Sequence, residues 1–168
     1  TPGTIDRLPM ATAFTVTVPA GTTSETGGTL AQDVTFDFAT PAPTVEAFAP
    51  QGNSLVLQPT FVAVFDQVVD PAAVLDHLTL DADGTRPVRQ ATPEEIDADD
   101  TVRPIVDRAL DGRWVAFRPV EPLPADTPLT VTFGEGTPSA EGPRTTAAEQ
   151  RYSGRTFPPL RIVRTECG

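Results

Sequence analysis

Residues 123–133 read Leu-Pro-Ala-Asp-Thr-Pro-Leu-Thr-Val-Thr-Phe, and residues 8–18 read the close variant Leu-Pro-Met-Ala-Thr-Ala-Phe-Thr-Val-Thr-Val. The similarity continues beyond both stretches, because Gly21-Thr-x-Ser24 is matched by Gly136-Thr-x-Ser139. Each copy has a strand-like stretch, a long loop rich in Gly, Ser and Thr, and a second strand-like stretch. An internal repeat at about the length of a small domain indicates a string of similar modules. We therefore expect the first copy to hold only the last two strands of one module, and the second copy to end a complete module.

The two strands of the first copy are predicted from strict alternation of apolar and polar residues. Their apolar members are Phe14, Val16 and Val18, and then Val34, Phe36 and Phe38. A period of two predicts strands with one apolar face. Thr40-Pro-Ala-Pro43 follows as a stiff linker, because proline fixes φ and removes a backbone donor. The expected domains are residues 1–41 as the last two strands of a preceding immunoglobulin-like repeat, residues 42–159 as a complete domain, and residues 160–168 as the start of a linker.

The larger part of the chain is predicted to form an antiparallel immunoglobulin-like β-sandwich. Apolar stretches recur between turn signals at the spacing that sandwiches show. The predicted strands cover residues 44–48, 60–65, 77–80, 85–89 and 113–118, followed by the two strands of the second copy, about seven in all. Turns are expected at residues 50–53 and at residues 81–84. Because strands and helices do not alternate, a parallel sheet is disfavoured and the fold class is all-β.

Two helical segments are expected among the strands. Asp70 followed by Pro71 is a capping residue with proline at the first helical position, which predicts a short helical turn with Val74 and Leu75 facing inward. Residues 92–111 form a helical insertion that begins with the capping-box sequence Thr92-Pro-Glu-Glu95. Because Pro104 falls inside the apolar pattern of the insertion, we expect two short helices rather than one.

The composition excludes several classes of partner and site. The 168-residue chain carries a formal net charge of −11, and an acidic surface repels both phosphate backbones and anionic lipid. We therefore expect no nucleic-acid binding and no membrane contact by this segment. The one cysteine, Cys167, cannot by itself form an internal disulfide or a zinc site.

One short motif has the spacing that opens a calcium loop. In Asp81-x-Asp83-Gly84 the two aspartates stand at the first ligand positions, but the twelfth position holds Thr92 instead of a bidentate Glu. A hairpin turn built on Asp-Gly is favoured, so Asp81 and Asp83 are weak metal candidates and no cofactor is expected. The acidic residues between 94 and 100 form either a site for a cation or basic partner or, as we favour, a solvated helix start.

No catalytic set is visible in the sequence, and we predict that the chain is not an enzyme. His77 is the only histidine, and no serine lies in the Gly-x-Ser-x-Gly context that exposes a nucleophile. Aromatic residues in the predicted strands form either a sandwich core, which their period of two favours, or a platform for a glycan. These residues are Phe61, Phe65, Trp114, Phe117 and Tyr152.

Several strings of sequence resemble the N-terminal immunoglobulin-like repeats of bacterial α2-macroglobulin-family proteins. The strings are Arg7-Leu-Pro-Met-Ala-Thr12, Val18-Pro-Ala-Gly-Thr22, Thr26-Gly-Gly-Thr-Leu30, Ala63-Val-Phe-Asp-Gln67, Gly112-Arg-Trp114, Phe117-Arg-Pro119 and Thr137-Pro-Ser-Ala-Glu-Gly-Pro143. They also resemble bacterial immunoglobulin-like repeats more generally. The resemblance implies an exported parent in the periplasm or cell envelope that entraps proteases, with these modules as spacers or contact surfaces. The family's thioester sequence, Cys-x-Glu-Gln, is absent because Ala147 stands where the cysteine is required.

Two functions stay open at this point. The first is a non-enzymatic module of a protease trap, whose partners are the neighbouring domains and, through the parent, proteases. The alternative is a repeat of a surface adhesin that binds a glycan or a partner protein.

In either case the hairpin within residues 12–40 needs a cover, because an isolated hairpin is marginal in water and has open edges. The second module, another copy of the chain or strand exchange can supply that cover, and we favour an intermolecular contact.

Overall fold

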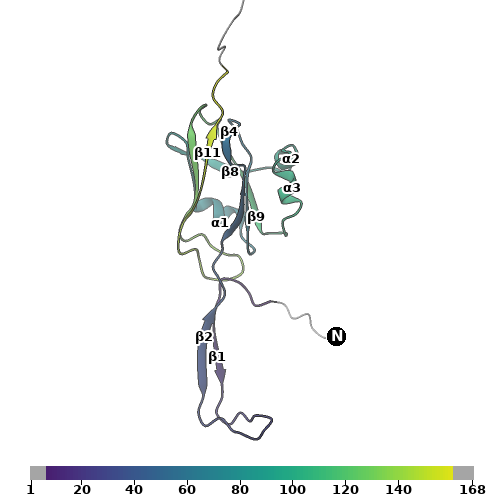
Figure 1. Cartoon of the computed structure of the whole chain (residues 1–168), viewed down its shortest axis with the longest axis vertical. Coiled ribbons are helices and arrows are strands. Elements are labelled where there is room, and N and C mark those ends of the chain that lie inside the picture. Colours follow the sequence, from purple (N-terminus) through teal and green to yellow (C-terminus); the bar gives the residue numbers. More distant parts are fainter. Residues whose placement is uncertain (1–6, 161–168) are drawn as a thin grey trace, which may run out of the picture.

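The computed structural model describes residues 7–160, which form a β-sandwich with a long β-hairpin extending from one end (Figure 1). The hairpin consists of β1 (Ala13–Val18) and β2 (Val34–Ala39), with Phe14 opposite Phe38 and Val18 opposite Val34. Both strands lie where the alternation of apolar residues predicts them. Because the hairpin points away from the sandwich, the second module does not cover it, and that way of protecting its edges is excluded.

The sandwich has two sheets. The first contains five strands in the order β4-β11-β10-β6-β7, and the second contains four in the order β3-β5-β9-β8. Their bounds are Val45–Ala49 for β3, Gly52–Leu55 for β4, Phe61–Phe65 for β5, Leu78–Asp81 for β6, Thr85–Arg86 for β7, Val88–Gln90 for β8, Trp114–Pro119 for β9, Pro128–Phe133 for β10 and Gln150–Thr156 for β11. All pairs are antiparallel except β4 with β11. The predicted all-β immunoglobulin-like sandwich is confirmed.

Aromatic side chains fill the space between the two sheets. Phe61 and Phe117 are fully buried, with ring centroids 5.3 Å apart. Phe48 stacks on Tyr152 at 4.5 Å, and Phe133 meets Phe48 edge-on at 6.0 Å. Burial of apolar surface contributes roughly 25 cal/mol per Å², so this buried cluster stabilises the packing of one sheet on the other. Of the aromatic residues predicted for the core, Phe61, Phe65, Phe117 and Tyr152 lie there, whereas Trp114 is half-buried in a separate cluster.

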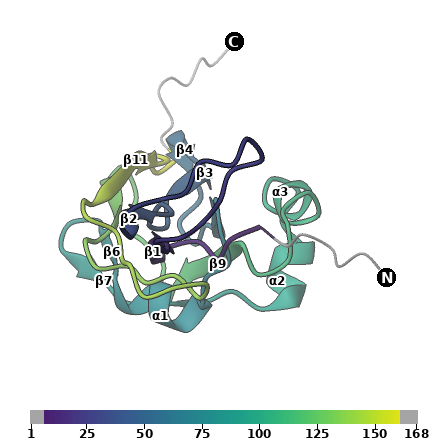
Figure 2. The same cartoon turned by 90° about the horizontal axis from the view of Figure 1, so that it is seen from below.

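The two faces of β9 pack against two different clusters. Val115 and Phe117 point into the space between the sheets, whereas Ala116 and Trp114 belong to a second cluster on the outer face of the four-stranded sheet. The helices α2 (Pro93–Asp97) and α3 (Arg103–Val106) cover this outer face (Figure 2). The prediction of two short helices in the insertion is confirmed.

Capping residues begin two of the three helices as predicted. Asp70 accepts a hydrogen bond of 2.9 Å from the amide of Ala72 at the start of α1 (Pro71–Asp76). In α2, the Thr92 side chain and the Glu95 backbone and carboxylate form the reciprocal capping box. Within α1, Val74 is fully buried and Leu75 packs at the edge of the same core.

Two parts of the strand prediction are wrong. The expected strand over residues 85–89 is divided at Pro87, so that β7 pairs with β6 in one sheet and β8 pairs with β9 in the other. Proline has no amide hydrogen for a ladder, and here it marks the point where the chain changes sheets. The expected turn at residues 50–53 instead leads into β4, whose parallel pairing with β11 is possible because Gly154 has no side chain to meet Leu55.

The repeat in the sequence is also a repeat of structure. Ala11 and Asp126 occupy matching positions and both have left-handed backbones, with φ of 52° and 55°. At one end of the hairpin the Thr12 amide donates to the Thr40 hydroxyl at 3.0 Å, and in the sandwich the Thr127 amide donates to the Thr156 hydroxyl at 2.9 Å. The two hydroxyls in turn donate to equivalent proline carbonyls, those of Pro9 and Pro124. Because these details recur together, β1–β2 has the same local construction as β10–β11.

Candidate interaction surfaces

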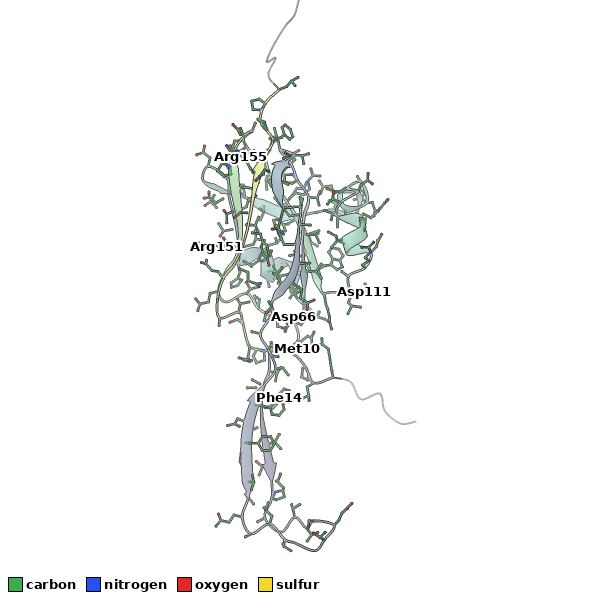
Figure 3. All side chains as sticks on the ribbon, in the orientation of Figure 1. Met10, Phe14, Asp66, Asp111, Arg151 and Arg155 are labelled. Atoms are coloured by element: carbon green, nitrogen blue, oxygen red, sulfur yellow. The ribbon has the colours of Figure 1, made fainter. Side chains whose placement is uncertain are left out.

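The hairpin and the sandwich meet at a junction, which we define as residues 10–12, 40–41, 66–68 and 139–144. Figure 3 shows Met10 and Asp66 at this level, with Phe14 at the sandwich end of the hairpin. The loop between β10 and β11 lies against the hairpin base, because the Arg144 amide donates to the Ala11 carbonyl at 2.8 Å and its guanidinium donates to the Thr40 carbonyl. The loop is thus bonded to both strands of the hairpin.

Glu141 lies at the centre of the junction. Its carboxylate accepts hydrogen bonds from the Arg7 guanidinium at 2.5 Å, from the Val68 amide at 2.8 Å and from the Met10 amide at 3.2 Å. Desolvation opposes ionisation of this carboxyl, but the two amides and Arg7 outweigh it and hold the pKa below its ordinary value. The ionised Glu141 therefore joins the hairpin base to the loop that follows β5.

Gln67 makes a second connection inside the same junction. Its side chain is fully buried, and its amide nitrogen donates to the Pro41 carbonyl at 3.4 Å and to the Asp66 carboxylate at 3.2 Å. Its amide oxygen accepts from the Ser139 hydroxyl at 2.7 Å, which itself accepts from the Glu141 amide at 3.0 Å. A buried polar side chain is tolerated only when its hydrogen bonds are made, so Gln67 holds these segments in one arrangement.

Sequence reasoning missed the junction residues. Gln67 and Glu141 appear only as parts of strings that carry a family resemblance, and Arg144 was not singled out at all. The contacts of Glu141 with Arg7 span more than a hundred residues of sequence, so no local spacing reveals them. One available signal was Gly142, which follows Glu141 and occupies the repeat position of Gly27.

The second surface is one face of the hairpin, which we call the hairpin face. It consists of Phe14, Val16 and Val18 from β1 and Val34, Phe36 and Phe38 from β2, which lie directly opposite one another in the pairing register. The β2 members are exposed, with 51% of Phe36 accessible to solvent, and those of β1 are half-buried. The opposite face is polar, since Thr15 donates to Asp37 at 2.5 Å and Thr17 bonds Thr35 at 3.2 Å. The hairpin is therefore amphipathic, and none of its six apolar side chains belongs to either buried cluster of the described residues.

The weak metal candidates Asp81 and Asp83 lie in the hairpin turn between β6 and β7. Asp83 has φ of 55°, and the turn closes through the Ala82 amide and the Gly84 carbonyl at 3.0 Å. The Arg86 guanidinium donates to the carbonyls of Ala82 and Asp83 at 2.9 and 3.0 Å. This guanidinium brings a positive charge to the turn, and within residues 7–160 no group of three or more His, Cys, Asp or Glu that could hold a metal ion occurs.

Two of the acidic residues near α2, Glu95 and Asp99, have structural partners within the fold. Glu95 accepts from Arg89 at 2.5 Å and from Arg118 at 3.1 Å, besides closing the capping box. The hydrogen bonds from Arg89 and from the Thr92 amide, together with the charge of Arg118, lower the pKa of Glu95 to about 2. Asp99 accepts from the amides of Thr101 and Val102. These contacts give the two carboxylates structural partners.

The single histidine has a structural place as well. His77 ends α1, and its Nδ1 lies 3.0 Å from the Ala73 carbonyl oxygen. In the described part of the chain, no hydrogen bond joins His77 to a serine.

None of the three helices is long and apolar enough to cross a membrane, over the residues that the structure describes.

Comparison with known families gives one match. A family model described as bacterial Ig-like domain matches residues 39–156, from the end of β2 to the end of β11. A search of curated proteins finds no match.

Proposed function

Because that match covers most of the chain, the chain belongs to the bacterial Ig-like domain family, and from this premise we propose that it is a non-enzymatic module of an α2-macroglobulin-like protease-trapping protein of the bacterial cell envelope. Domains of this family typically act as structural or interaction modules outside the cell. In the proposed parent, exported to the periplasm or envelope, the module sets the distance and orientation of the domains around it. Its direct partners are those neighbouring domains, and proteases are partners of the parent as a whole.

The observation that carries this proposal is the junction. A spacer transmits orientation only if successive modules are held by several specific bonds, and Glu141, Gln67 and Arg144 supply such bonds. A freely jointed linker would instead leave the modules in many relative orientations. The junction therefore supports a role as a structural spacer better than a role in which one exposed loop binds a ligand.

The strings that resemble the α2-macroglobulin family support the finer part of the proposal. Three of them, residues 7–12, 63–67 and 137–143, meet at the junction through the contacts of Glu141 and Gln67. Part of the resemblance therefore lies where the hairpin joins the sandwich. This is the part of a spacer on which the geometry of a large trap depends.

The test is a trapping assay on the full-length parent protein. A trap that has been cleaved by an active protease should leave that protease able to cleave a small chromogenic peptide but unable to cleave a large protein substrate. The same protease inactivated beforehand at its nucleophile is the control and should remain free. A protease that keeps its activity on both substrates, and elutes apart from the parent, would remove the protease-trap proposal and leave the structural module.

The adhesin alternative is kept because aromatic side chains are exposed on the hairpin face, notably Phe36 and Phe38. A glycan array probed with the chain discriminates the two functions. Binding of a sugar that Phe36→Ala abolishes would favour the adhesin, and an empty array together with a positive trapping assay would favour the spacer.

A further inference from the structure

We propose that the hairpin face is one wall of the core of a second immunoglobulin-like sandwich, whose remaining strands are supplied by residues that precede Thr1 in the same polypeptide. The partner is thus a sandwich of the present type that lacks its last two strands. This inference does not depend on whether the parent is a protease trap or an adhesin.

The first argument is the fate of the matching residues in the sandwich. Leu129, Val131 and Phe133 of β10 correspond to Phe14, Val16 and Val18 of β1, and they are almost completely buried. Their cover comes from the strands of the first half of the sandwich; for example, Phe65 and Phe117 contact Phe133 through ring edges. The hairpin repeats the two strands that β10 and β11 contribute to this core. The described chain holds no second set of the other strands, against which the hairpin could pack.

The segments that lead into the two hairpins show the same contrast. Leu123 is 2% exposed, and its amide donates to the Leu57 carbonyl at 2.7 Å, so a segment from the first half of the sandwich fixes it. Leu8, at the matching position before β1, is 50% exposed. Exposed apolar side chains that gather on one surface mark interaction sites. Here the repeat indicates that the matching surface is the first half of a sandwich like the one that covers Leu123.

The edges of the hairpin give the expected register. In the sandwich, residues 130–133 of β10 pair with β6, and Gly154 and Thr156 of β11 pair with β4. The matching positions are residues 15–18 on the outer edge of β1 and Phe38 and Thr40 on the outer edge of β2. We therefore expect an antiparallel β6-like strand beside β1 and a short parallel β4-like strand beside β2.

A second copy of the chain is a poorer occupant of the hairpin face. The sandwich of such a copy already contains β10–β11 in the position that the hairpin would take. The net charge of −11 on each copy also opposes close approach. The upstream segment, by contrast, is covalently linked to the hairpin, and in the proposed sandwich the hairpin takes a position that no other strands occupy.

The experiment compares the 168-residue chain with the longer product of its gene, extended upstream by about 100 residues, the usual size of such a domain. Amide hydrogen exchange of residues 15–18 is measured in both. Each protein is also made as Phe36→Asp, on the hairpin face, and as Thr35→Asp, the matched control on the polar face of the same strand. Size-exclusion chromatography with light scattering gives the mass of every variant.

The proposal expects slow exchange at residues 15–18 in the longer protein only. In that protein Phe36→Asp should lower the melting temperature of the upstream domain by about 10 °C or more, or prevent its folding, since it buries a charge, and Thr35→Asp should change it by no more than about 2 °C. In the 168-residue chain both variants should leave the melting of the sandwich unchanged.

Three results would overturn the proposal. One is a gene that encodes no domain before Thr1. Another is a longer protein in which residues 15–18 exchange as fast as in the short one, or in which Phe36→Asp behaves like Thr35→Asp. The third is a dimer of the 168-residue chain that protects residues 15–18 and is dissociated by Phe36→Asp, because a second copy would then be the occupant.

Discussion

Gly142 shows at the residue scale how closely the junction is packed. A Cβ at this position would collide with the Thr12 hydroxyl and the Met10 carbonyl oxygen, and would lie 2.6 Å from the Ala11 carbonyl oxygen. Two of these three atoms belong to the backbone, which cannot rotate away as a side chain can. The backbone of Gly142 is not left-handed, so the requirement for glycine here is one of space.

Gly142→Ala should therefore weaken the junction. We expect a loss of about 1–3 kcal/mol in the free energy of unfolding, the usual range for an overpacked site, with faster amide exchange at residues 11 and 12. Urea denaturation and hydrogen exchange measure the two effects. Gly28→Ala in the hairpin loop is the control, because its Cβ would meet only the Ser24 hydroxyl at 3.3 Å. Equal stability of the two variants would show that the backbone around Gly142 can move to accommodate a methyl group at little cost in free energy.

At the scale of elements, the parts that the sequence predicts are those whose pattern is local. β1 is predicted to its last residue because alternation continues through all of it, and α2 is predicted because its capping box lies within four residues. β4 was missed because Gly52, Asn53 and Ser54 are exposed and polar, so that only Leu55 reaches the core. The junction was missed for a different reason, because its bonds join loops that are distant in sequence. Long-range pairing, unlike alternation, leaves little trace in a short stretch of residues.

Glu95 connects α2 to β8 and β9 through Arg89 and Arg118. Its replacement should therefore change how the free energy of unfolding depends on pH. The pKa of Glu95 is lowered to about 2 in the fold, so its contribution is complete above the ordinary pKa near 4.5 and is lost as the pH falls from there towards 2. Glu95→Gln should reduce the free energy of unfolding at pH 7 by about 1 kcal/mol, as expected for a partly exposed ion pair that also closes a cap. Urea denaturation at several pH values measures the difference between wild type and variant, which should shrink below pH 4.5.

The control for this prediction is Asp97→Asn on the same helix. Asp97 is exposed and makes no side-chain hydrogen bond or ion pair with the described residues. The difference between wild type and this variant should be small at every pH. A Glu95→Gln difference that stays constant from pH 7 to pH 2 would contradict the assigned role of the Glu95 charge.

On the scale of the whole molecule, the chain is a sandwich that holds a β-hairpin of similar local construction at a defined position. The family match covers the sandwich and begins at the end of β2, whereas the hairpin is related to the sandwich only by the internal repeat. The orientation between the two parts depends on few groups, and Glu141 is the carboxylate that bonds both the hairpin base and the loop after β5. The stiffness of the molecule should therefore depend on that carboxylate.

Glu141→Ala should broaden the range of orientations between hairpin and sandwich, because the amides of Met10 and Val68 and the Arg7 guanidinium lose their shared acceptor. Pulsed electron-electron spin resonance measures this between spin labels on Thr26→Cys in the hairpin loop and Glu46→Cys on β3, in a Cys167→Ser background. The wild-type background should give a narrow distance distribution at pH 7 and a broader one as the pH falls through the lowered pKa of Glu141, whose protonation removes the charge. Glu149→Ala is the control, since Glu149 pairs with Arg151 at 2.5 Å within the sandwich, and its distribution should match the wild-type background. If Glu141→Ala is as narrow as Glu149→Ala at pH 7, then Gln67 and Arg144 suffice to fix the orientation, and the stiffness of the junction does not depend on Glu141.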